Sequence, residues 1–205
     1  MARSNRQGAE NFYLLTSNAG IESKSGLGSY VRNTEEIRDA LPALFKKYDI
    51  RSIVDCPCGD WNWMRLVPLD TIDYLGLDII PALIHENRAR YQTPLIRFGV
   101  HDMIRDPLPS SDLVICRDFL FHLSLDQIKA CMQHIFRSGS RFLLTTSFPW
   151  IESNPELTAE ELDNQWGWRM INVERPPIGL KHPVESIREN ETCRFREMRL
   201  YSLRG

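Results

Sequence analysis

The chain has 205 residues, with 25 Lys and Arg against 27 Asp and Glu, so its formal net charge is -2. Hydrophobic residues make up 42% and charged residues 25%, a globular mixture that excludes a disordered, collagenous or fibrous protein. The length fits one domain that folds without disulfides or a metal, and the charge balance gives no global basic field for nucleic acid.

Residues 1–33 are predicted to form a polar arm followed by a mobile loop. Residues 1–11 precede no apolar signal core, and no window approaches the roughly 20 apolar residues of a membrane-spanning helix. Ser, Gly and Asn are frequent in residues 16–33, which is typical of a loop. The chain has five Cys, an odd and modest number for this length, so we do not expect a secreted disulfide scaffold. We therefore expect a soluble, cytoplasmic protein with reduced thiols and no membrane contact.

Short apolar strands alternate with helices from residue 33 to residue 148. The expected strands span residues 51–55, 74–78, 95–99, 112–116 and 141–146. The expected helices span residues 33–49, 62–67, 81–91 and 125–137. Asn33 with Glu36 fits a capping box at the first of these helices. The alternation predicts a doubly wound, Rossmann-like α/β fold with a mostly parallel sheet and helices on both faces.

The pattern changes after Phe148. The following segment carries three tryptophans and no clear strand: Trp150, Trp166 and Trp168. Residues 172–174 and 196–203 are predicted as two final strands. We divide the single domain into an arm and lid (1–33), a core (34–148) and a segment that closes the sheet (149–205).

Acidic residues follow three of the predicted strands, at the sheet edge where open α/β sheets bind ligands. The first strand ends in Asp55 and leads to Gly59, which permits a tight turn. Asp78 ends the second strand, 23 residues after Asp55, and Asp102 follows the third. An acid about 20 residues beyond such a turn is placed to accept hydrogen bonds from ribose hydroxyls. The glycine alone fits an ordinary turn equally well, but its combination with both acids favours a nucleoside ligand.

These residues together resemble the class I S-adenosylmethionine-dependent methyltransferases. The first loop has the form D-x-P-C-G-D-x-x-W at residues 55–63, which resembles a bacterial subgroup of that superfamily. Further similarity lies in residues 116–124 and 137–149, and the whole resemblance covers residues 26–180. It implies a seven-stranded sheet with an antiparallel C-terminal strand, S-adenosyl-L-methionine as the cofactor, and methyl transfer as the activity.

The first loop also departs from the superfamily pattern. Pro57 stands where a first glycine is usual, and Trp61 where a third is usual. The same two residues contradict a nicotinamide-dependent oxidoreductase, which would need the multi-glycine loop.

The resemblance assigns the cofactor to residues from five segments. They are Gly28 and Tyr30 as a lid, Asp55, Pro57, Cys58, Gly59 and Trp63, Asp78 and Ile79, Asp102 and Met103, and Arg117. It implies that Asp78 holds the ribose hydroxyls and that Asp55 lines the methionine and ribose portion. Asp102 would accept from the adenine amino group, with Ile79 and Met103 against the ring. Arg117 would lie beside the sulfonium end.

Three residues after the fourth strand are candidate catalytic groups. Asp118 and His122 are four apart, so on a helical turn they would share one face, and a carboxylate raises the basicity of an imidazole. We expect His122 or Asp118 to be the acceptor-side base, with Arg117 beside them. The alternative is that His122 packs in a helix and Asp118 caps it.

The acceptor is the part of the function that the sequence defines least. Trp61, Trp150, Trp166 and Trp168 could wall a pocket for it, or could equally pack the last segment onto the sheet. We expect methyl transfer to a small-molecule or glycan-like acceptor, at oxygen, without nucleic acid as a partner. A nucleic-acid or protein methyltransferase and a non-catalytic, cofactor-binding regulatory subunit are the alternatives. The oligomeric state stays open.

Two further groups of residues are interpreted as structural. The spacing of Cys56, Cys58 and Cys116 does not match a zinc motif, so we expect no metal and read them as small buried thiols. The C-terminal charges alternate in sign, which favours a solvated edge: Glu189, Glu191, Arg194, Arg196, Glu197, Arg199 and Arg204.

Overall fold

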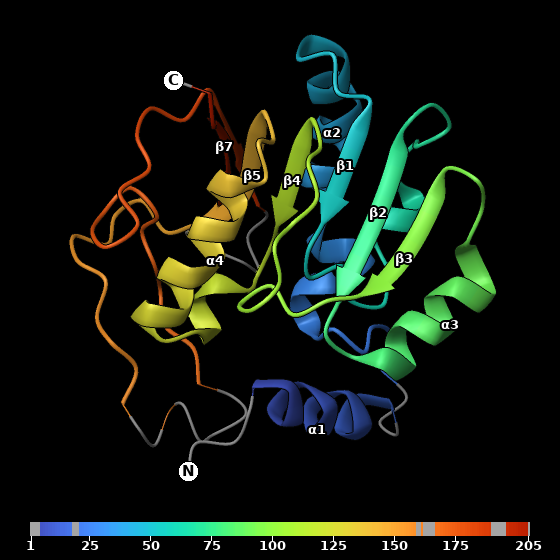
Figure 1. Ribbon diagram of the computed structural model, residues 1–205, viewed down its shortest axis with the longest axis horizontal. Helices are drawn as coiled ribbons and strands as arrows, with labels where there is room; N and C mark the ends of the chain where they lie inside the picture. Colours follow the sequence, from blue (N-terminus) through green and yellow to red (C-terminus); the bar gives the residue numbers. More distant parts are fainter. Residues whose placement is uncertain (1–4, 18–20, 159–160, 162–166, 190–195, 205) are drawn as a thin grey trace.

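A computed structural model describes residues 5–17, 21–158, 161, 167–189 and 196–204 of the chain. Seven strands form one sheet, and helices cover both faces of it (Figure 1). The strands are β1 (Ser52–Asp55), β2 (Asp73–Asp78), β3 (Ile96–Val100), β4 (Leu113–Cys116), β5 (Phe142–Ser147), β6 (Glu185–Arg188) and β7 (Glu197–Ser202). The α-helices are α1 (Asn5–Ser17), α2 (Glu35–Lys47), α3 (Pro81–Tyr91) and α4 (Leu125–Arg137). Single 3-10 turns are η1 (Leu27–Ser29), η2 (Val31–Asn33), η3 (Met64–Leu66) and η4 (Leu120–His122).

The strand order is β3-β2-β1-β4-β5-β7-β6, which confirms the predicted fold class. The first five strands in chain order run parallel, whereas β7 pairs antiparallel with β5 and β6 antiparallel with β7. The chain builds outward from β1 through β2 to β3, then returns to place β4 on the other side of β1. The connections therefore diverge beyond the carboxyl ends of β1 and β4, and such a switch point is where open α/β sheets bind ligands.

Alternate residues of each central strand enter two separate cores. Ile53 of β1 and Ile115 of β4 pack with the residues of α2 and α3, while Val54 and Val114 pack with those of α4. This division follows from the two-residue period of a strand. Because both faces are covered, the central strands β1 and β4 are mostly buried and apolar, whereas the edge strand β3 also carries the exposed Arg97.

The first turns of helices α4 and α2 are capped in different ways. At α4, the Ser124 hydroxyl accepts from the Gln127 backbone N–H, and the Gln127 side chain accepts from the Ser124 N–H, a complete capping box. At α2, the predicted box of Asn33 with Glu36 is wrong. The helix begins after Thr34 with no side-chain cap, and the Asn33 amide donates instead to the Leu27 carbonyl at 2.8 Å.

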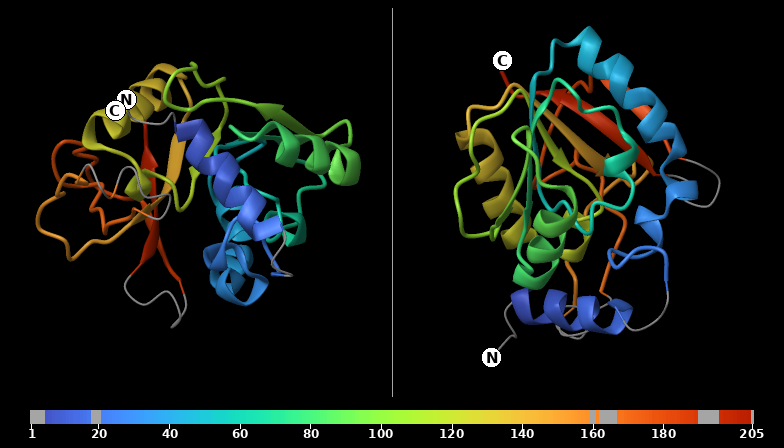
Figure 2. Two further views of the ribbon diagram at one scale, coloured as in Figure 1. Left: turned by 90° about the horizontal axis from the view of Figure 1, so that it is seen from below. Right: turned by 90° about the vertical axis from the view of Figure 1, so that its right-hand side faces the viewer.

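Three other predictions differ from the structure. Residues 62–67 contain only the 3-10 turn η3, and residues 172–174 lie outside any strand. The edge strand β6 was missed because Glu185–Arg188 has a single apolar residue, Ile187, so it carries no hydrophobic pattern. The predicted N-terminal arm contains α1, which crosses beneath the carboxyl ends of the strands (Figures 1 and 2).

No helix in the described part of the chain is both long and apolar enough to cross a lipid bilayer.

Candidate functional site

The loop after β1 is held from both of its neighbours in the sheet. The Cys58 N–H donates to the Leu77 carbonyl of β2 at 2.8 Å, and the Gly59 N–H donates to Asp78 Oδ2 at 3.1 Å. Asn87 of α3, which is buried, donates from Nδ2 to the Gly59 carbonyl at 2.8 Å. Gly59 has a φ of 57°, in the left-handed region that favours glycine. Sequence reasoning missed Asn87, because a lone Asn within a helix carries no pattern.

Two buried carboxylates lie at the ends of neighbouring strands, Asp55 on β1 and Asp78 on β2. Burial raises the pKa of Asp55 to about 7, although a 2.6 Å hydrogen bond from the Tyr74 hydroxyl and the charge of Arg117 act in the opposite direction. Burial likewise raises the pKa of Asp78 to about 6, although hydrogen bonds from the backbone N–H groups of Ile80 and Gly59 act in the opposite direction. Carboxylates held this way suit a ligand that supplies hydroxyl donors and a positive charge.

The residues assigned to the adenine end lie next to this pair. Asp102 follows β3 and accepts from the Ile104 N–H at 3.0 Å, with the Arg105 guanidinium 3.6 Å away. Ile79 is partly buried and packs against the core between the sheet, α2 and α3. Met103 is buried in the opposite core, beside Leu77 and α4, so its side chain fills the protein interior rather than an open site.

Other residues of the first loop also point inward. The Cys58 side chain is buried in the core, and burial raises its thiol pKa well above the usual value. Pro57 is partly buried. Cys56 and Cys116 are buried thiols as well, each with a raised pKa caused first by burial. Among the residues that the structure describes, no group of His, Cys, Asp or Glu is arranged to bind a metal ion.

The N-terminal residues 21–33, here called the lid, lie directly on the first loop. Asp60 receives hydrogen bonds from the Ser23 hydroxyl at 3.0 Å, the Lys24 N–H at 2.7 Å and the Ser25 hydroxyl at 3.1 Å. A Cβ at Gly59 would come within 2.3 Å of the Ser25 hydroxyl, which shows how closely the two backbones approach. The lid therefore covers the end of β1.

A second set of contacts joins the lid to α1 and α3. Glu86 of α3 accepts from the Tyr13 hydroxyl at 2.6 Å and from Lys24 Nζ at 2.6 Å. The Lys24 ammonium also lies 4.9 Å from the centre of the Tyr13 ring. Tyr30, predicted as a lid residue, is partly buried between η1 and η2 and lies beneath the Arg32 guanidinium.

Arg117 connects the lid to the end of β4. Its Nη2 donates to the Gly28 carbonyl at 2.9 Å, and its guanidinium lies 5.4 Å from the centre of the buried Trp63 ring. Gly28 also approaches Asp118 so closely that a Cβ on Gly28 would lie 2.5 Å from Asp118 Oδ2. The structure thus brings together Gly28, Trp63 and Arg117, which the sequence could only assign separately.

Replacing Gly28 with alanine should therefore loosen the lid. Asp118 cannot move aside freely, because Arg117, Arg196 and Thr146 all contact its carboxylate. We expect the free energy of unfolding to fall by about 1–3 kcal/mol, the usual cost of overpacking. Backbone amide exchange in residues 21–33 should become faster, measured by mass spectrometry. Ala9→Gly on α1 is a control outside the lid, and unchanged lid exchange in Gly28→Ala would contradict this prediction.

Arg117 and Asp118 belong to a larger set of charges that includes two C-terminal residues, Glu189 and Arg196. Arg117 Nη2 lies 2.6 Å from Glu189 Oε1, and Arg196 Nη1 lies 2.6 Å from Asp118 Oδ2. Arg196 Nε also contacts Glu189 Oε2, and Arg117 Nη1 lies 3.2 Å from Asp118 Oδ2. We call Arg117, Asp118, Glu189 and Arg196 the charge cluster.

The charge cluster corrects the interpretation of the C-terminal charges as a solvated edge. The Glu189 side chain is 0% exposed and that of Arg196 is 9% exposed. The alternation of sign along the chain was real, but the fold turns two of these residues inward. Glu191 and Arg194 lie outside the described residues.

The predicted pair of Asp118 and His122 is not joined by any hydrogen bond among the described residues. Asp118 has a φ of 53°, so the chain turns sharply before η4 instead of continuing as a helix. Burial opposes ionisation of Asp118, but Arg117 and Arg196 outweigh it and lower its pKa. Asp118 is consequently held as an anion within the charge cluster, which makes it a weak base.

His122 has a different partner. Its Nδ1 lies 3.0 Å from the Gly167 carbonyl, so Nδ1 carries the proton and Nε2 keeps a lone pair. One edge of the residue is exposed, yet the surrounding protein lowers its pKa by desolvation. The imidazole is therefore neutral near pH 7, the form in which a histidine accepts a proton.

Aromatic side chains gather around His122 beyond the ends of β4 and β5. Phe121 contacts the His122 ring at 4.5 Å, Phe148 at 6.1 Å and Trp168 at 6.2 Å, and Trp150 contacts Phe148 at 5.5 Å, all between ring centres. Trp150 is 44% exposed and Trp168 is 55% exposed. These five residues are called the aromatic surface. Trp166 lies outside the described residues.

The chain after β5 is fixed in place by side chains that sequence reasoning did not single out. The Asn172 amide donates to the carbonyls of Pro149 and Ile151, both at 2.9 Å, and its backbone N–H donates to Asn154 Oδ1 at 2.9 Å. The buried Arg169 donates to the Leu123 carbonyl at 2.7 Å. These bonds hold Trp150 and Trp168 beside η4.

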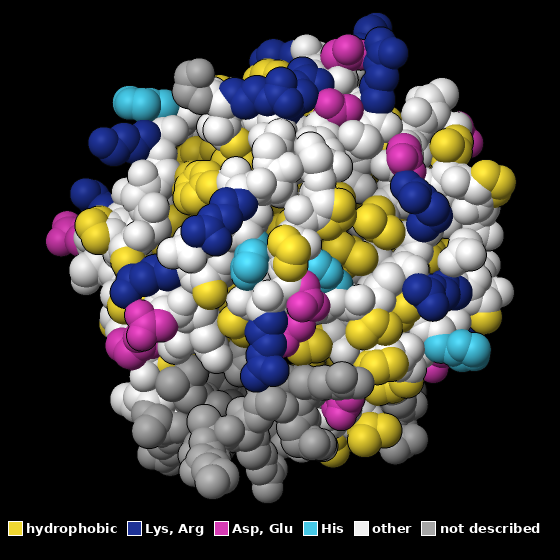
Figure 3. Space-filling model, viewed as in Figure 1, with side chains coloured by type: hydrophobic (Ala, Val, Ile, Leu, Met, Phe, Trp, Pro, Cys, Tyr) yellow, Lys and Arg dark blue, Asp and Glu magenta, His cyan; other side chains and the backbone are white. Residues whose placement is uncertain are grey.

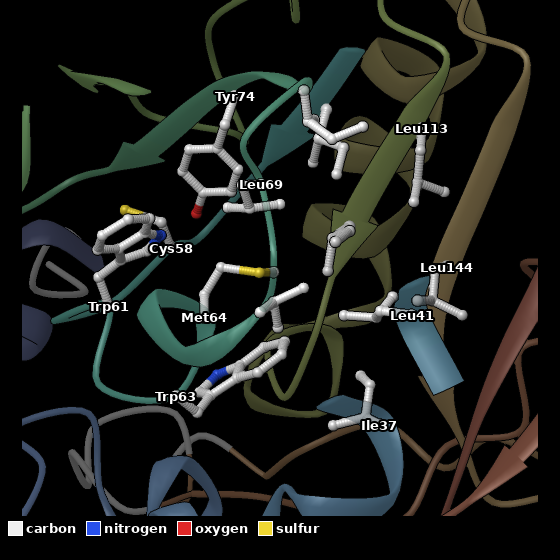
Figure 4. Packing of buried hydrophobic residues seen from close by; sticks show 14 of the residues in the cluster. Ile37, Leu41, Cys58, Trp61, Trp63, Met64, Leu69, Tyr74, Leu113 and Leu144 are labelled. Atoms are coloured by element: carbon white, nitrogen blue, oxygen red, sulfur yellow. The ribbon is translucent and has the colours of Figure 1, made fainter. Parts of the chain in front are cut away.

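Trp61 does not belong to the aromatic surface, which corrects its assignment to the acceptor. It is 7% exposed and packs against Tyr74, Tyr91 and Phe98, with ring centres 5.0–5.6 Å apart. Figure 4 shows its ring beside Tyr74 and Cys58. Its outer edge helps to line a surface hollow of about 410 Å³ beside Leu69 and Ile96, at the amino end of β3. Trp61 is thus a core residue on the α3 side of the sheet.

The two classes of tryptophan should respond differently to substitution. Trp61→Ala is expected to lower the free energy of unfolding by about 3–5 kcal/mol, because it empties a packed aromatic core. Trp168→Ala should change it by less than about 1 kcal/mol, because the ring is already largely in water. Chemical denaturation of both variants measures the difference. Equal losses would show that the two rings have the same structural role.

No family model and no curated protein sequence matches the chain. Solved structures do. The N-methyltransferase NodS from Bradyrhizobium japonicum, solved with S-adenosyl-L-homocysteine, aligns with a TM-score of 0.68 at 11% identity over 98% of both chains. Magnesium protoporphyrin IX methyltransferase from Synechocystis aligns with a TM-score of 0.63 at 11% identity, over 96% of this chain and 95% of that one.

Human N-acetylserotonin methyltransferase aligns with a TM-score of 0.57 at 15% identity, and there the chain covers 98% of its own length but only 56% of its neighbour's. Identities this low carry the fold and no more. The chain has the seven-stranded, Rossmann-like fold of the class I S-adenosylmethionine-dependent methyltransferases.

Proposed function

We propose that the protein is an S-adenosylmethionine-dependent methyltransferase that acts on a small-molecule or glycan-like acceptor, at oxygen. The observation that carries this proposal is the buried pair Asp55 and Asp78 at the switch point of this fold, beneath the lid. A ribose offers two hydroxyl donors to Asp78, and a sulfonium or ammonium group offers a positive charge to Asp55. The donor set therefore fits the cofactor that neighbours in this fold contain.

The chain's own residues would contribute position and charge. When bound, the cofactor supplies a methyl group that its sulfonium already activates. Asp78 and the Gly59 loop orient the ribose portion, and the lid excludes water from that edge of the sheet. Arg117 and Asp118 lie between this edge and the acceptor side. His122 Nε2 is the atom that would take the proton from an acceptor hydroxyl.

The aromatic surface supports the choice of acceptor class. Aromatic faces bind sugar rings and other flat or apolar groups, and Trp150 and Trp168 present theirs to solvent beside His122. On the face shown in Figure 3, Lys and Arg side chains are interspersed with Asp and Glu. Elsewhere the exposed Arg97 pairs with the exposed Asp73. Positive charges that are balanced in this way do not favour binding of a phosphate backbone.

Thermal unfolding with added S-adenosylhomocysteine, compared with NAD and NADP, tests this function. Saturation at about 100 times the dissociation constant adds about 2.7 kcal/mol, which raises Tm by about 5–10 °C at this chain length. We expect this shift with S-adenosylhomocysteine alone. No shift with it, or an equal shift with a dinucleotide, would refute the proposal. Binding without turnover across a broad acceptor screen would instead favour a regulatory subunit.

A further inference from the structure

The charge cluster joins two regions that are far apart in the sequence, residues 117–118 on one side and residues 189 and 196 on the other. Arg117 and Asp118 follow β4, Glu189 follows β6, and Arg196 precedes β7. Three of the four lie beside Gly28 of the lid: Arg117 contacts its carbonyl, and a Cβ at Gly28 would lie 2.5 Å from Asp118 Oδ2 and 3.5 Å from Arg196 Nη1. Glu189 reaches the lid through Arg117. The two C-terminal members, Glu189 and Arg196, belong to no assigned site.

Glu189 fixes the orientation of the Arg117 guanidinium. Its Oε1 accepts from Arg117 Nε at 2.9 Å and from Arg117 Nη2 at 2.6 Å, so it occupies one edge of the guanidinium plane. Trp63 lies against the face of that plane. The same Nη2 still reaches the Gly28 carbonyl at 2.9 Å. A long arginine side chain held at its edge and its face has little freedom left.

Arg196 in turn holds the two carboxylates of the cluster. Its Nη1 donates to Asp118 Oδ2 at 2.6 Å, and its Nε contacts Glu189 Oε2. Two guanidinium groups and two carboxylates balance in charge, which is the condition under which ionic groups tolerate burial. The lid therefore closes on a cluster that the C-terminal strands complete.

Resting on the proposed function, we propose that Glu189 and Arg196 are positioning residues: they hold Arg117 against Gly28 and so keep the lid closed over the cofactor edge of the sheet. They act through Arg117 and not on a reacting atom. The C-terminal hairpin would thus control how firmly the N-terminal lid retains the cofactor.

The test replaces both residues together, because removing one alone would leave a buried charge without its partner. The pair Glu189→Gln and Arg196→Gln removes one charge of each sign, so it keeps the charge balance, and it also keeps the side-chain size at position 189. The matched control is Glu174→Gln with Arg199→Gln, since Arg199 Nη1 donates to Glu174 Oε1 at 2.6 Å from the same strand β7. Neither control residue contacts the charge cluster in the contacts described above.

Three measurements separate positioning from stability. In the ligand-free protein, amide exchange in residues 21–33 should be faster by about tenfold in the Glu189/Arg196 pair and unchanged in the control. Affinity for S-adenosylhomocysteine, by calorimetry, should fall by about tenfold in the first pair only. The two pairs should have similar Tm values. Arg196→Lys retains the charge but not the two-pronged guanidinium, so its lid exchange should lie between those of the wild type and the Glu189/Arg196 pair.

Equal lid exchange in the two paired variants would overturn the positioning role, whatever their affinities. Wild-type protein that does not bind S-adenosylhomocysteine would refute the proposed function instead, and the exchange measurement on the ligand-free protein would still decide the role of Glu189 and Arg196.

Discussion

Replacing Asp78 with alanine is expected to weaken binding of S-adenosylhomocysteine by about a hundredfold or more. A hydrogen bond to a charged group contributes about 1.5–3 kcal/mol, and two ribose hydroxyls would lose one each. At about 1.4 kcal/mol for each tenfold step, this gives at least two orders of magnitude. The loop itself should also move, because Asp78 accepts from the Gly59 and Ile80 N–H groups at 3.1 Å.

Calorimetric titration measures this effect, with two further variants as controls. Asp78→Asn keeps the side-chain size and one acceptor oxygen, so its affinity should lie between wild type and Asp78→Ala. Asp73→Ala changes an acid at the other end of β2, where the carboxylate is exposed and pairs only with Arg97 in the contacts described here. Its affinity should equal that of the wild type. Wild-type affinity in Asp78→Ala would show that the ribose is held elsewhere.

Replacing Asp55 with asparagine is expected to stabilise the ligand-free protein at pH 8 by about 4 kcal/mol at most. The pKa of Asp55 is about 7 in the folded protein because the carboxyl is buried, and about 3.9 in an unfolded chain. The folded state therefore holds the proton more tightly than the unfolded state. Wild-type stability falls as the pH rises from about 4 to about 7, and each pKa unit corresponds to about 1.36 kcal/mol. Asparagine is never charged, so the variant should lack this fall.

Urea unfolding between pH 4 and pH 8 tests the sign of this effect. The stability difference between Asp55→Asn and wild type should be small near pH 4 and grow until about pH 7, in the range set by the two pKa values. Asp112→Asn is the control of opposite sign. Burial opposes ionisation of Asp112, but Arg141 and the N–H groups of Arg51 and Ser52 outweigh it and lower its pKa. Its substitution should therefore cost stability at pH 7 and less at low pH. A flat difference for Asp55→Asn would contradict its raised pKa.

A functional consequence follows from the same buried carboxyl. In the ligand-free protein, ionisation of the buried Asp55 carboxyl is unfavourable. A cation bound near Asp55 would stabilise the carboxylate and so make ionisation favourable in the complex. The thermal shift caused by a cationic ligand should accordingly be larger at pH 8 than at pH 6. The chain would thus carry a stability cost at Asp55 that ligand binding offsets.

Local sequence patterns were sufficient to predict a feature where the pattern is compatible with only one kind of structure. The central strand Leu113–Cys116 is buried and apolar on both faces, and the other parallel strands are rich in apolar residues, so all five were found within a few residues. The acids at strand ends, Asp55 and Asp78, were found because the carboxyl ends of parallel strands share one edge of the sheet.

Other features failed for identifiable reasons. No sequence pattern distinguishes Trp61 from Trp168, yet Trp61 lies in the core and Trp168 is largely in water. Trp61 is buried because the chain turns at Gly59 and Trp61, both with left-handed φ. Asp118 and His122 are four residues apart, a spacing that would place them on one face of a helix. The left-handed φ of Asp118 turns the chain instead, so the two side chains have different partners. Glu189 and Arg196 look like surface charges because burial of an ion depends on partners that are distant in the chain.

The sequence by itself determined the fold class and placed Asp55 and Asp78 at the carboxyl ends of β1 and β2, the edge where we propose that the cofactor binds, because these features depend on strand periodicity and chain order. The tertiary structure alone decided how that edge is covered. The contacts of Asp60 with the lid, of Glu86 with Tyr13 and Lys24, and of Glu189 with Arg117 join residues between 35 and 73 positions apart. Hydrogen bonds and ion pairs between such distant residues leave no local pattern, so they exist only once the sheet has brought the segments together.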